Sequence, residues 1–243
     1  MKTKAVRLHG KEDLRLDEYE LPAIKPSEIR CRVVTDSICM SSYKAALQGA
    51  EHKRVPENIA EHPIIIGHEF CGVIEEVGAD WLEKFKVGQK FVVQPNLRYN
   101  NTLAALGYSY EFAGGAAQHI ILPAEAMLTD NVFIYEGDAF FYGSLSEPIS
   151  CIVGAYKANF HTTSESYEHI MGIKKGGCVA ILAGAGPMGL GMIDLACNVQ
   201  KPKVVVVTDI DDARLQRAAS IITVENAAKN GVTLHYEIGR AHV

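Results

Sequence analysis

In CVAILAGAGPMGLG, Cys178–Gly191, an apolar run leads into a glycine-rich loop. Three glycines have the spacing G-x-G-x-x-G; the run before them predicts a buried strand and the residues after them a helix. There, the first glycine permits a tight turn, the second lets a pyrophosphate approach, and the third lets the helix pack on the strand. The helix N-terminus offers free N–H groups to an anion. A dinucleotide is therefore expected to contact Gly184, Gly186, Pro187, Met188 and Gly189.

An acidic residue about 20 positions further along is the second mark of a dinucleotide site. Asp209 lies 20 residues after Gly189, at the end of the apolar run KVVVVTD. Its carboxylate would accept hydrogen bonds from the ribose hydroxyls and repel a 2′-phosphate, which favours NAD over NADP. Arg214 lies near enough to weaken that preference and is counted with the cofactor-binding residues. The alternative is a glycine turn in an α/β domain that binds no cofactor, with Asp209 as a helix cap; the complete set of elements favours dinucleotide binding.

The chain changes its pattern near residue 149. Before that point it has short apolar or alternating runs bounded by Gly, Pro and Asn, which predict strands of a barrel or sandwich: KAVRLH, EIRCRVVTDSI, FCGVIEEVG, QKFVVQP and AAQHIIL. After it, helical spacing in ISCIVGAYKANF is followed by strand, glycine loop, helix, strand and helix, which indicates a parallel, doubly wound sheet. We therefore expect a β-rich domain at 1–148 and the start of an α/β domain at 149–243.

Composition excludes several classes of protein. A formal net charge of −5 argues against a nucleic-acid-binding surface. No run approaches the ~20 apolar residues of a membrane-spanning helix, and the N-terminus has no signal-peptide core. The six cysteines are scattered, without a short paired pattern, so we expect reduced thiols in the cytoplasm.

Metal-ligating residue types occur in three stretches of the first half. TDSICMSSY (Thr35–Tyr43) supplies Cys39, IIIGHEFCGVIEEVG (Ile64–Gly78) supplies His68 and Glu69, and SLSEPISC (Ser144–Cys151) supplies Glu147. Sulfur, nitrogen and oxygen donors together suit zinc, and three protein ligands with an open position make a catalytic site. Each residue alone is more simply a core cysteine, a surface pair or a loop end. Their combination with a dinucleotide fold favours a metal site.

These motifs resemble the zinc-dependent medium-chain dehydrogenases, the family of alcohol and sorbitol dehydrogenases, over nearly the whole chain. Gly67-His68-Glu69 with Gly72 and Gly78 resembles the family's zinc signature, and GGAAQHIILPAE (Gly114–Glu125) resembles the family's strand before the catalytic turn. SEPISC is similar to the polyol dehydrogenase branch. YEHIMGIKKGG and AGAGPMGLG look most like sugar-phosphate reductases of the L-sorbose 1-phosphate type. The resemblance implies a GroES-like catalytic domain followed by a Rossmann domain, the latter incomplete.

The resemblance implies roles for matching positions. Cys39 and His68 would bind zinc, Glu69 would be a ligand or an exchangeable neighbour, and Glu147 would be a ligand or hold the zinc-bound water. Ser41 would relay the substrate proton. Two positions depart from the pattern: Met40 replaces a glycine, and Lys44 stands where alcohol dehydrogenases often have a relay histidine. Because the stretch 94–115 has no cysteine, we expect one catalytic zinc and no structural zinc.

The resemblance also implies the reaction, hydride transfer between NAD(H) and a secondary alcohol or ketone of a polyol, ketose or sugar phosphate. A homo-oligomer is expected for the full-length protein. Lys53 and Arg54 lie in a loop soon after Cys39 and could meet a substrate phosphate, although a solvated charged loop is the simpler interpretation. One alternative is a zinc-free nucleotide-binding or structural protein of the same fold. Another is a zinc-free quinone reductase relative, against which Cys39, His68 and Glu147 argue.

A complete doubly wound sheet has six strands, but after KVVVVTD only VTLHY remains as a candidate. From this we expect a C-terminally truncated and inactive fragment. The last seven residues, EIGRAHV (237–243), can be back-translated to a common sequencing-adapter sequence followed by a stop codon. We hypothesise that this segment is not part of the natural protein, which an intact genomic locus encoding it would disprove.

Overall fold

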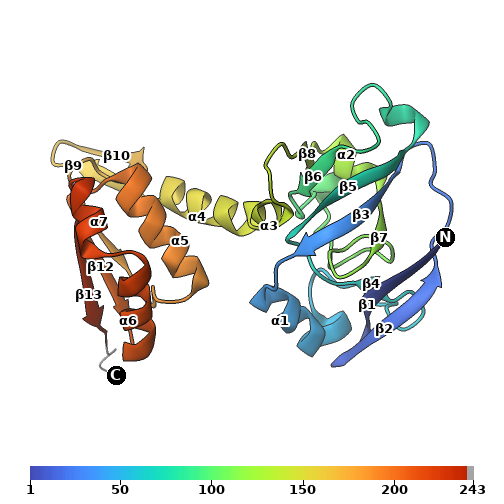
Figure 1. Cartoon of the computed structure of the whole chain (residues 1–243), viewed down its shortest axis with the longest axis horizontal. Coiled ribbons are helices and arrows are strands. Elements are labelled where there is room, and N and C mark those ends of the chain that lie inside the picture. Colours follow the sequence, from blue (N-terminus) through green and yellow to red (C-terminus); the bar gives the residue numbers. More distant parts are fainter. Residues whose placement is uncertain (240–243) are drawn as a thin grey trace. The chain divides into compact units, whose positions relative to one another are not determined.

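A computed structural model describes residues 1–239 of the chain (Figure 1). Residue contacts divide it into one unit from Met1 to Glu147 and a second from Pro148 onward. Of the segment 237–243 set apart above, residues 240–243 lie outside the described residues.

The first unit is built on two antiparallel sheets. The larger sheet has the strand order β7-β3-β5-β6-β8, with the bounds β3 Ile29–Asp36, β5 Phe70–Val77, β6 Lys90–Val93, β7 His119–Leu122 and β8 Val132–Ile134. The smaller has the order β2-β1-β4, with the bounds β1 Lys2–Gly10, β2 Asp13–Glu20 and β4 Ile64–Ile65. Alternate apolar side chains of these strands form one core that includes Ile29, Phe70, Ile74, Phe91 and Leu122.

The pairing of β3 with β5 places the candidate metal residues. The two strands run antiparallel with Asp36, at the end of β3, opposite Phe70, at the start of β5. The segment that leaves β3 therefore lies beside the turn that enters β5. The first segment carries Cys39 and the second carries His68 and Glu69.

Short helices connect the strands of the first unit. Their bounds are α1 Met40–Gln48, α2 Ala124–Leu128 and α3 Phe140–Ser144, with single 3₁₀ turns at Gly49–Glu51, Ala79–Trp81 and Tyr99–Asn101. Helix α1 was not predicted from the sequence; it begins directly after Cys39 and has Ala45 and Ala46 on its buried face.

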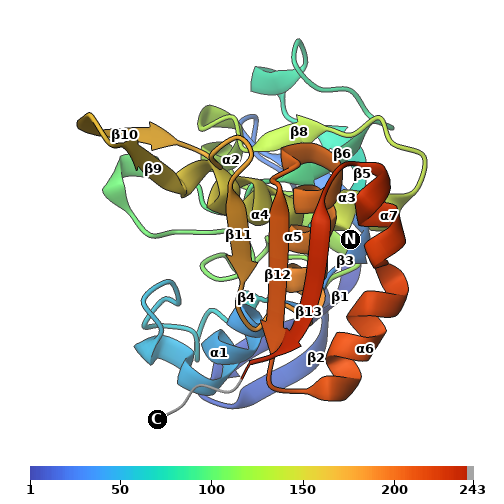
Figure 2. The ribbon, with the colours of Figure 1, turned by 90° about the vertical axis from the view of Figure 1, so that its left-hand side faces the viewer.

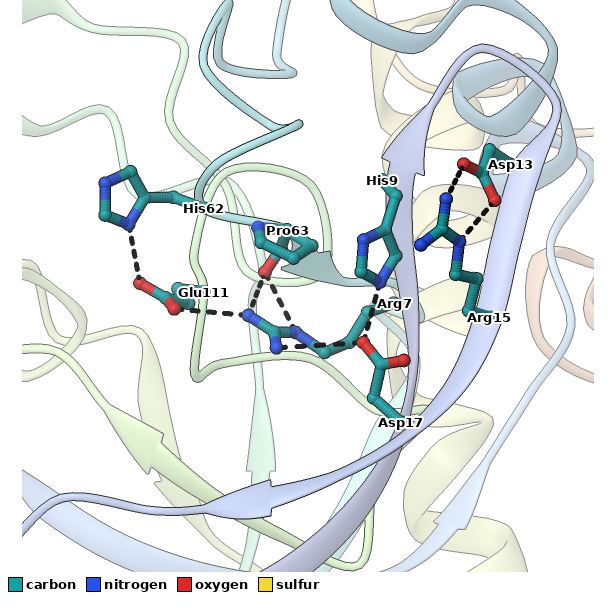
Figure 3. Close-up of polar contacts among 8 residues, drawn as sticks. All are labelled: Arg7, His9, Asp13, Arg15, Asp17, His62, Pro63 and Glu111. Atoms are coloured by element: carbon teal, nitrogen blue, oxygen red, sulfur yellow. Dashed lines mark hydrogen bonds and ion pairs between the residues drawn. The ribbon is translucent and has the colours of Figure 1, made fainter.

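A buried arginine ties the smaller sheet together (Figure 3). Arg7 of β1 is 7% exposed, and its guanidinium donates to the carbonyl of Pro63 (3.0 and 2.6 Å) and to Glu111 (3.2 Å). A third nitrogen lies 3.7 Å from the carboxylate of Asp17 on β2. The cation also lies 4.5 Å from the ring centre of Tyr19. Because the buried charge has partners on all sides, it holds β1, β2 and the segment before β4 in register.

The second unit contains a parallel sheet with the order β11-β12-β13, seen side by side in Figure 2. The strands are β11 Cys178–Ile181, β12 Val204–Asp209 and β13 Thr233–Ile238. The helices are α4 Ser146–Ala158, α5 Pro187–Leu195, α6 Asp212–Ile221 and α7 Val224–Lys229. The first two residues of α4 belong to the first unit. A π-helical turn, Ala196–Gln200, extends α5. Val205 and Val207 of β12 lie at the centre of the core.

This architecture confirms the predicted fold class, a β-rich unit followed by an α/β unit. A hairpin in the second unit was also not predicted: β9 Phe160–Thr163 and β10 Ser166–Met171 pair antiparallel between α4 and β11. Within residues 1–239, no helix combines the length and apolar character needed to cross a membrane.

Candidate metal and dinucleotide sites

Three predicted ligands meet in the first unit. The sulfur of Cys39, a ring nitrogen of His68 and a carboxylate oxygen of Glu69 all lie within 4.8 Å of one another. His68 and Glu69 are each 5% exposed, and Cys39 is partly buried. Thiolate, imidazole and carboxylate at this spacing are a donor set that zinc accepts, so these residues fit a single metal ion.

The turn that carries His68 and Glu69 is held by backbone contacts. Gly67 has a left-handed φ of +89°, and a Cβ at this position would lie 2.1 Å from Oδ2 of Asp36. Oδ1 of Asp36 accepts the backbone N–H of Glu69 at 3.2 Å, while the N–H of Ser37 donates to the carbonyl of Glu69 at 3.0 Å. Gly67 is therefore required by its left-handed backbone conformation and by the lack of space for a Cβ. Burial raises the pKa of the neighbouring Asp36 to about 7.

Burial also sets the charge state of the two ligands in the turn. It lowers the pKa of His68 to about 4, with a smaller contribution from the charge of Arg54, so the imidazole is neutral at pH 7 and has a lone pair for a metal. Burial raises the pKa of Glu69, against hydrogen bonds from Cys39 and Glu147 that lower it. A cation at this place would remove the cost of burying the carboxylate.

Glu147, the fourth predicted ligand, lies in the first turn of α4. Its carboxyl hydrogen-bonds the carboxyl of Glu69, but it does not belong to the group of three residues within 4.8 Å. In this arrangement Glu147 contacts a candidate ligand directly, and its role as a ligand stays a prediction.

A hydroxyl pair lies beside the cluster. Oγ of Ser41 donates to the sulfur of Cys39 at 3.0 Å and lies 2.7 Å from the hydroxyl of Tyr108, which is 3.4 Å from Nε2 of His68. The rings of Tyr108 and His68 are 4.8 Å apart. Ser41 was predicted at this site and Tyr108 was not. The loop of Tyr108 reaches the site because Gly107 packs against Gly67, where a Cβ would lie 2.0 Å from the Gly67 carbonyl oxygen.

The glycine loop has the predicted form in the second unit. It joins β11 to α5, with Gly186 as the N-cap and Pro187 and Met188 in the first turn. A Cβ on Gly189 would lie 2.0 Å from the carbonyl oxygen of Gly184, so the third glycine allows helix and loop to touch. A Cβ on Gly186 would meet nothing within 4 Å, which leaves open space above the backbone. The left-handed residue of the turn is Ala183 (φ +52°), not the first glycine.

Gly184 has a different reason to be glycine. A Cβ there would lie 2.8 Å from the side chain of Ile181 and 2.9 Å from that of Val207. The first glycine therefore lets the loop cross closely above β11 and β12.

Asp209 lies at the end of β12 and contacts the glycine loop. Its two oxygens accept the backbone N–H groups of Ala185 (3.1 Å) and Asp211 (3.2 Å), and these amides lower its pKa. The cap of α6 is Asp211, which accepts from the N–H of Arg214, so Asp209 is not a helix cap. The side chain of Arg214 lies 3.4 Å from Asp211. The carboxylate of Asp209 keeps lone-pair capacity that could accept a ribose hydroxyl.

Comparison with known proteins bears on both units. Residues 25–130 match the model of the alcohol dehydrogenase GroES-like domain. L-sorbose 1-phosphate reductase of Klebsiella pneumoniae is 50% identical over 217 residues, which are 89% of this chain and 53% of that protein. Mannitol-1-phosphate 5-dehydrogenase of Aliivibrio fischeri is 49% identical over 235 residues, which are 96% of this chain and 55% of that protein. The chain is thus similar to zinc-type medium-chain dehydrogenases over most of its length.

Solved structures of dehydrogenases share the fold. The crystal structure of 2R,3R-butanediol dehydrogenase from Bacillus subtilis superposes with a TM-score of 0.70 at 23% sequence identity. The match covers 99% of this chain and 65% of the dehydrogenase chain. The chain spans about half the length of the curated relatives it matches. The GroES-like match includes Cys39, Ser41, His68 and Glu69, whereas Glu147 and the glycine loop lie outside it.

Proposed function

We propose that the whole protein is a zinc-dependent oxidoreductase that transfers a hydride between NAD(H) and a secondary alcohol or ketone of a polyol, ketose or sugar phosphate. The observation that carries the proposal is the convergence of Cys39, His68 and Glu69 on one point in a GroES-like unit. The names of the similar proteins support the substrate class, since two act on phosphorylated sugars or polyols by their names. Free buried thiols at Cys31, Cys71 and Cys197 fit the cytoplasm, and we keep a homo-oligomer as part of the proposal.

The metal residues would act as a binding and orienting set. Cys39, His68 and Glu69 would hold the zinc, which when bound supplies Lewis acidity that lowers the pKa of a substrate hydroxyl or polarises a carbonyl. Glu147, through its hydrogen bond to Glu69, would orient that carboxylate or compete for it.

The hydroxyl pair would move the proton. Ser41 lies next to Cys39 and can accept the proton of a substrate hydroxyl held at the cluster. As Ser41 accepts that proton it passes its own to Tyr108, 2.7 Å away, and Tyr108 in turn releases its own hydroxyl proton to solvent; the reverse reaction returns a proton along the same path. Burial raises the pKa of Tyr108, so the phenol stays protonated and acts by exchanging protons rather than as a standing base.

The second unit would bind the cofactor. The open backbone at Gly186 and the first N–H groups of α5 would receive the pyrophosphate, and Asp209 the adenosine ribose. A carboxylate with a lowered pKa stays ionised and repels a 2′-phosphate, which supports NAD as the preferred cofactor. The nicotinamide itself supplies the redox chemistry.

The proposal is tested by the zinc content of the purified chain, measured by elemental analysis. Wild type is expected to hold about one zinc per chain, and Cys39→Ala and His68→Ala to lose it. Cys178→Ala, which removes an exposed thiol of the second unit, is the matched control and should keep it. Folded wild-type protein without zinc, or zinc that survives Cys39→Ala, would contradict the proposal.

A further inference from the structure

A row of aromatic rings leads away from the metal cluster. The ring of Tyr108 lies 4.8 Å from that of His68 on one side and stacks on that of His52 on the other, at 5.7 Å and 13°. His52 is 9% exposed, and its Nδ1 accepts the backbone N–H of Arg54 at 3.3 Å. The hydroxyl of Ser109 donates to the carbonyl of Arg54 at 2.7 Å, which ties the residue to the loop of Tyr108. Arg54 is thus fixed to the same wall as the candidate site.

Three positively charged side chains act electrostatically on His52, at the outer end of this row. Burial lowers the pKa of His52, and the charges of Arg54, Lys44 and Lys53 lower it further. Lys44 comes from α1, whereas Lys53 and Arg54 come from the loop after it. The charge of Arg54 also reaches His68 and lowers its pKa, as a smaller cause than burial.

These cations have no carboxylate of their own within the described part of the chain. Nη1 of Arg54 donates to two neutral oxygens, Oδ1 of Asn96 at 3.3 Å and the carbonyl of Leu103 at 2.9 Å. None of the described ion pairs includes Arg54, Lys44 or Lys53, and nearby Glu51 pairs with Lys11 instead. The guanidinium is therefore held in place by neutral partners while its charge is left for an anion.

We propose that Arg54, with Lys44 and Lys53, receives the phosphate group of a phosphorylated polyol or ketose whose reacting carbon lies at the metal cluster. This inference rests on the proposed function and narrows its substrate class. A guanidinium and two ammonium groups match a phosphate dianion in charge, and the planar fork of arginine supplies directed hydrogen bonds. From the sequence alone, a solvated charged loop is the simpler interpretation of Lys53 and Arg54; the half-buried, anchored position of Arg54 supports phosphate binding instead.

The test compares two probes that differ only in the phosphate, D-mannitol 1-phosphate and D-mannitol. Each is titrated calorimetrically into the zinc-loaded chain. Wild type is expected to bind the phosphorylated probe at least tenfold more tightly, the effect of charge-assisted hydrogen bonds. Arg54→Met should bring the two affinities within about twofold of each other. Lys44→Met, which removes no described hydrogen bond, should reduce the preference severalfold and keeps the test valid if Arg54→Met does not fold.

The control is Lys86→Met, which removes an exposed cation from another loop of the same unit and should leave the preference unchanged. Equal weakening of both probes by Arg54→Met, or a preference that survives both Arg54→Met and Lys44→Met, would overturn the inference. If wild type binds zinc but does not prefer the phosphorylated probe, the phosphate inference is wrong and the proposed function stands. If wild type binds no zinc, the proposed function is wrong, and the phosphate inference that rests on it fails as well.

Discussion

Replacing Gly189 with alanine is expected to destabilise the second unit, because the new Cβ would lie 2.0 Å from the carbonyl oxygen, 2.4 Å from the carbonyl carbon and 2.6 Å from the Cα of Gly184. Ordinary contacts of this kind lie near ~3.5 Å, so α5 and the loop must separate by about 1.5 Å. All three atoms are backbone and cannot rotate away. Overpacking costs about 1–3 kcal/mol, and this contact belongs at the upper end.

The matched substitution is Gly186→Ala, at a residue with φ −82° where the Cβ would meet nothing within 4 Å. Loss of the glycine at this N-cap costs about 0.5–1 kcal/mol. The methyl group would occupy the space proposed for the pyrophosphate. Gly186→Ala should therefore keep the fold and bind ADP-ribose at least tenfold more weakly.

The assays are thermal unfolding of the second unit and calorimetric titration with ADP-ribose. For a unit of this size, ~3 kcal/mol corresponds to a fall in Tm of roughly 12–24 °C for Gly189→Ala. A Tm of Gly189→Ala within ~2 °C of wild type would refute the packing argument. Wild-type affinity for ADP-ribose in Gly186→Ala would refute the assignment of the phosphate site.

The other predictions concern charge and the proton path. The pKa of Asp209 is lowered in the folded chain, so its ionised form stabilises the fold at pH values above its ordinary pKa. This contribution is lost as the pH falls through the lower pKa of the folded state. Asp209→Asn should therefore be less stable than wild type in chemical denaturation at pH 7, and the difference should shrink below pH ~4. In the full-length protein, Ser41→Ala should lower alcohol oxidation by about 100-fold and Tyr108→Phe by somewhat less, with zinc content unchanged; turnover within twofold of wild type would exclude the relay. Arg7→Met should destabilise the first unit by about 2–4 kcal/mol in urea unfolding, whereas Arg15→Met, at an exposed pair, should change it little; equal effects would contradict the role given to the buried cation (Figure 3).

The dinucleotide loop could be predicted from the sequence because all its determinants are local. Strand, three glycines, helix and the acid after the next strand follow one another along the chain, and each has a steric or electrostatic reason to be there. Two details of the loop were not predicted. Ala183 rather than a glycine takes the left-handed conformation, and Asp211 rather than Asp209 caps α6.

The metal cluster depends on strand pairing, which the sequence does not state. Cys39 and His68 meet because β3 and β5 run antiparallel with Asp36 opposite Phe70. From the sequence they could be grouped only by their donor types and by the family resemblance, not by a contact. Tyr108 escaped because its loop has neither periodicity nor a ligand motif; it reaches Ser41 through the contact of Gly107 with Gly67. Arg54 was noticed as part of a charged loop, but its anchoring by neutral oxygens follows from the fold alone.

Zinc K-edge X-ray absorption of the purified chain identifies the ligands of the bound metal directly. If Cys39, His68 and Glu69 hold the metal, the shell contains one sulfur at about 2.3 Å and nitrogen or oxygen donors at about 2.0–2.2 Å, and Cys39→Ser removes the sulfur. A shell without sulfur, or one with four sulfurs, would contradict the assignment of this cluster as the catalytic zinc site.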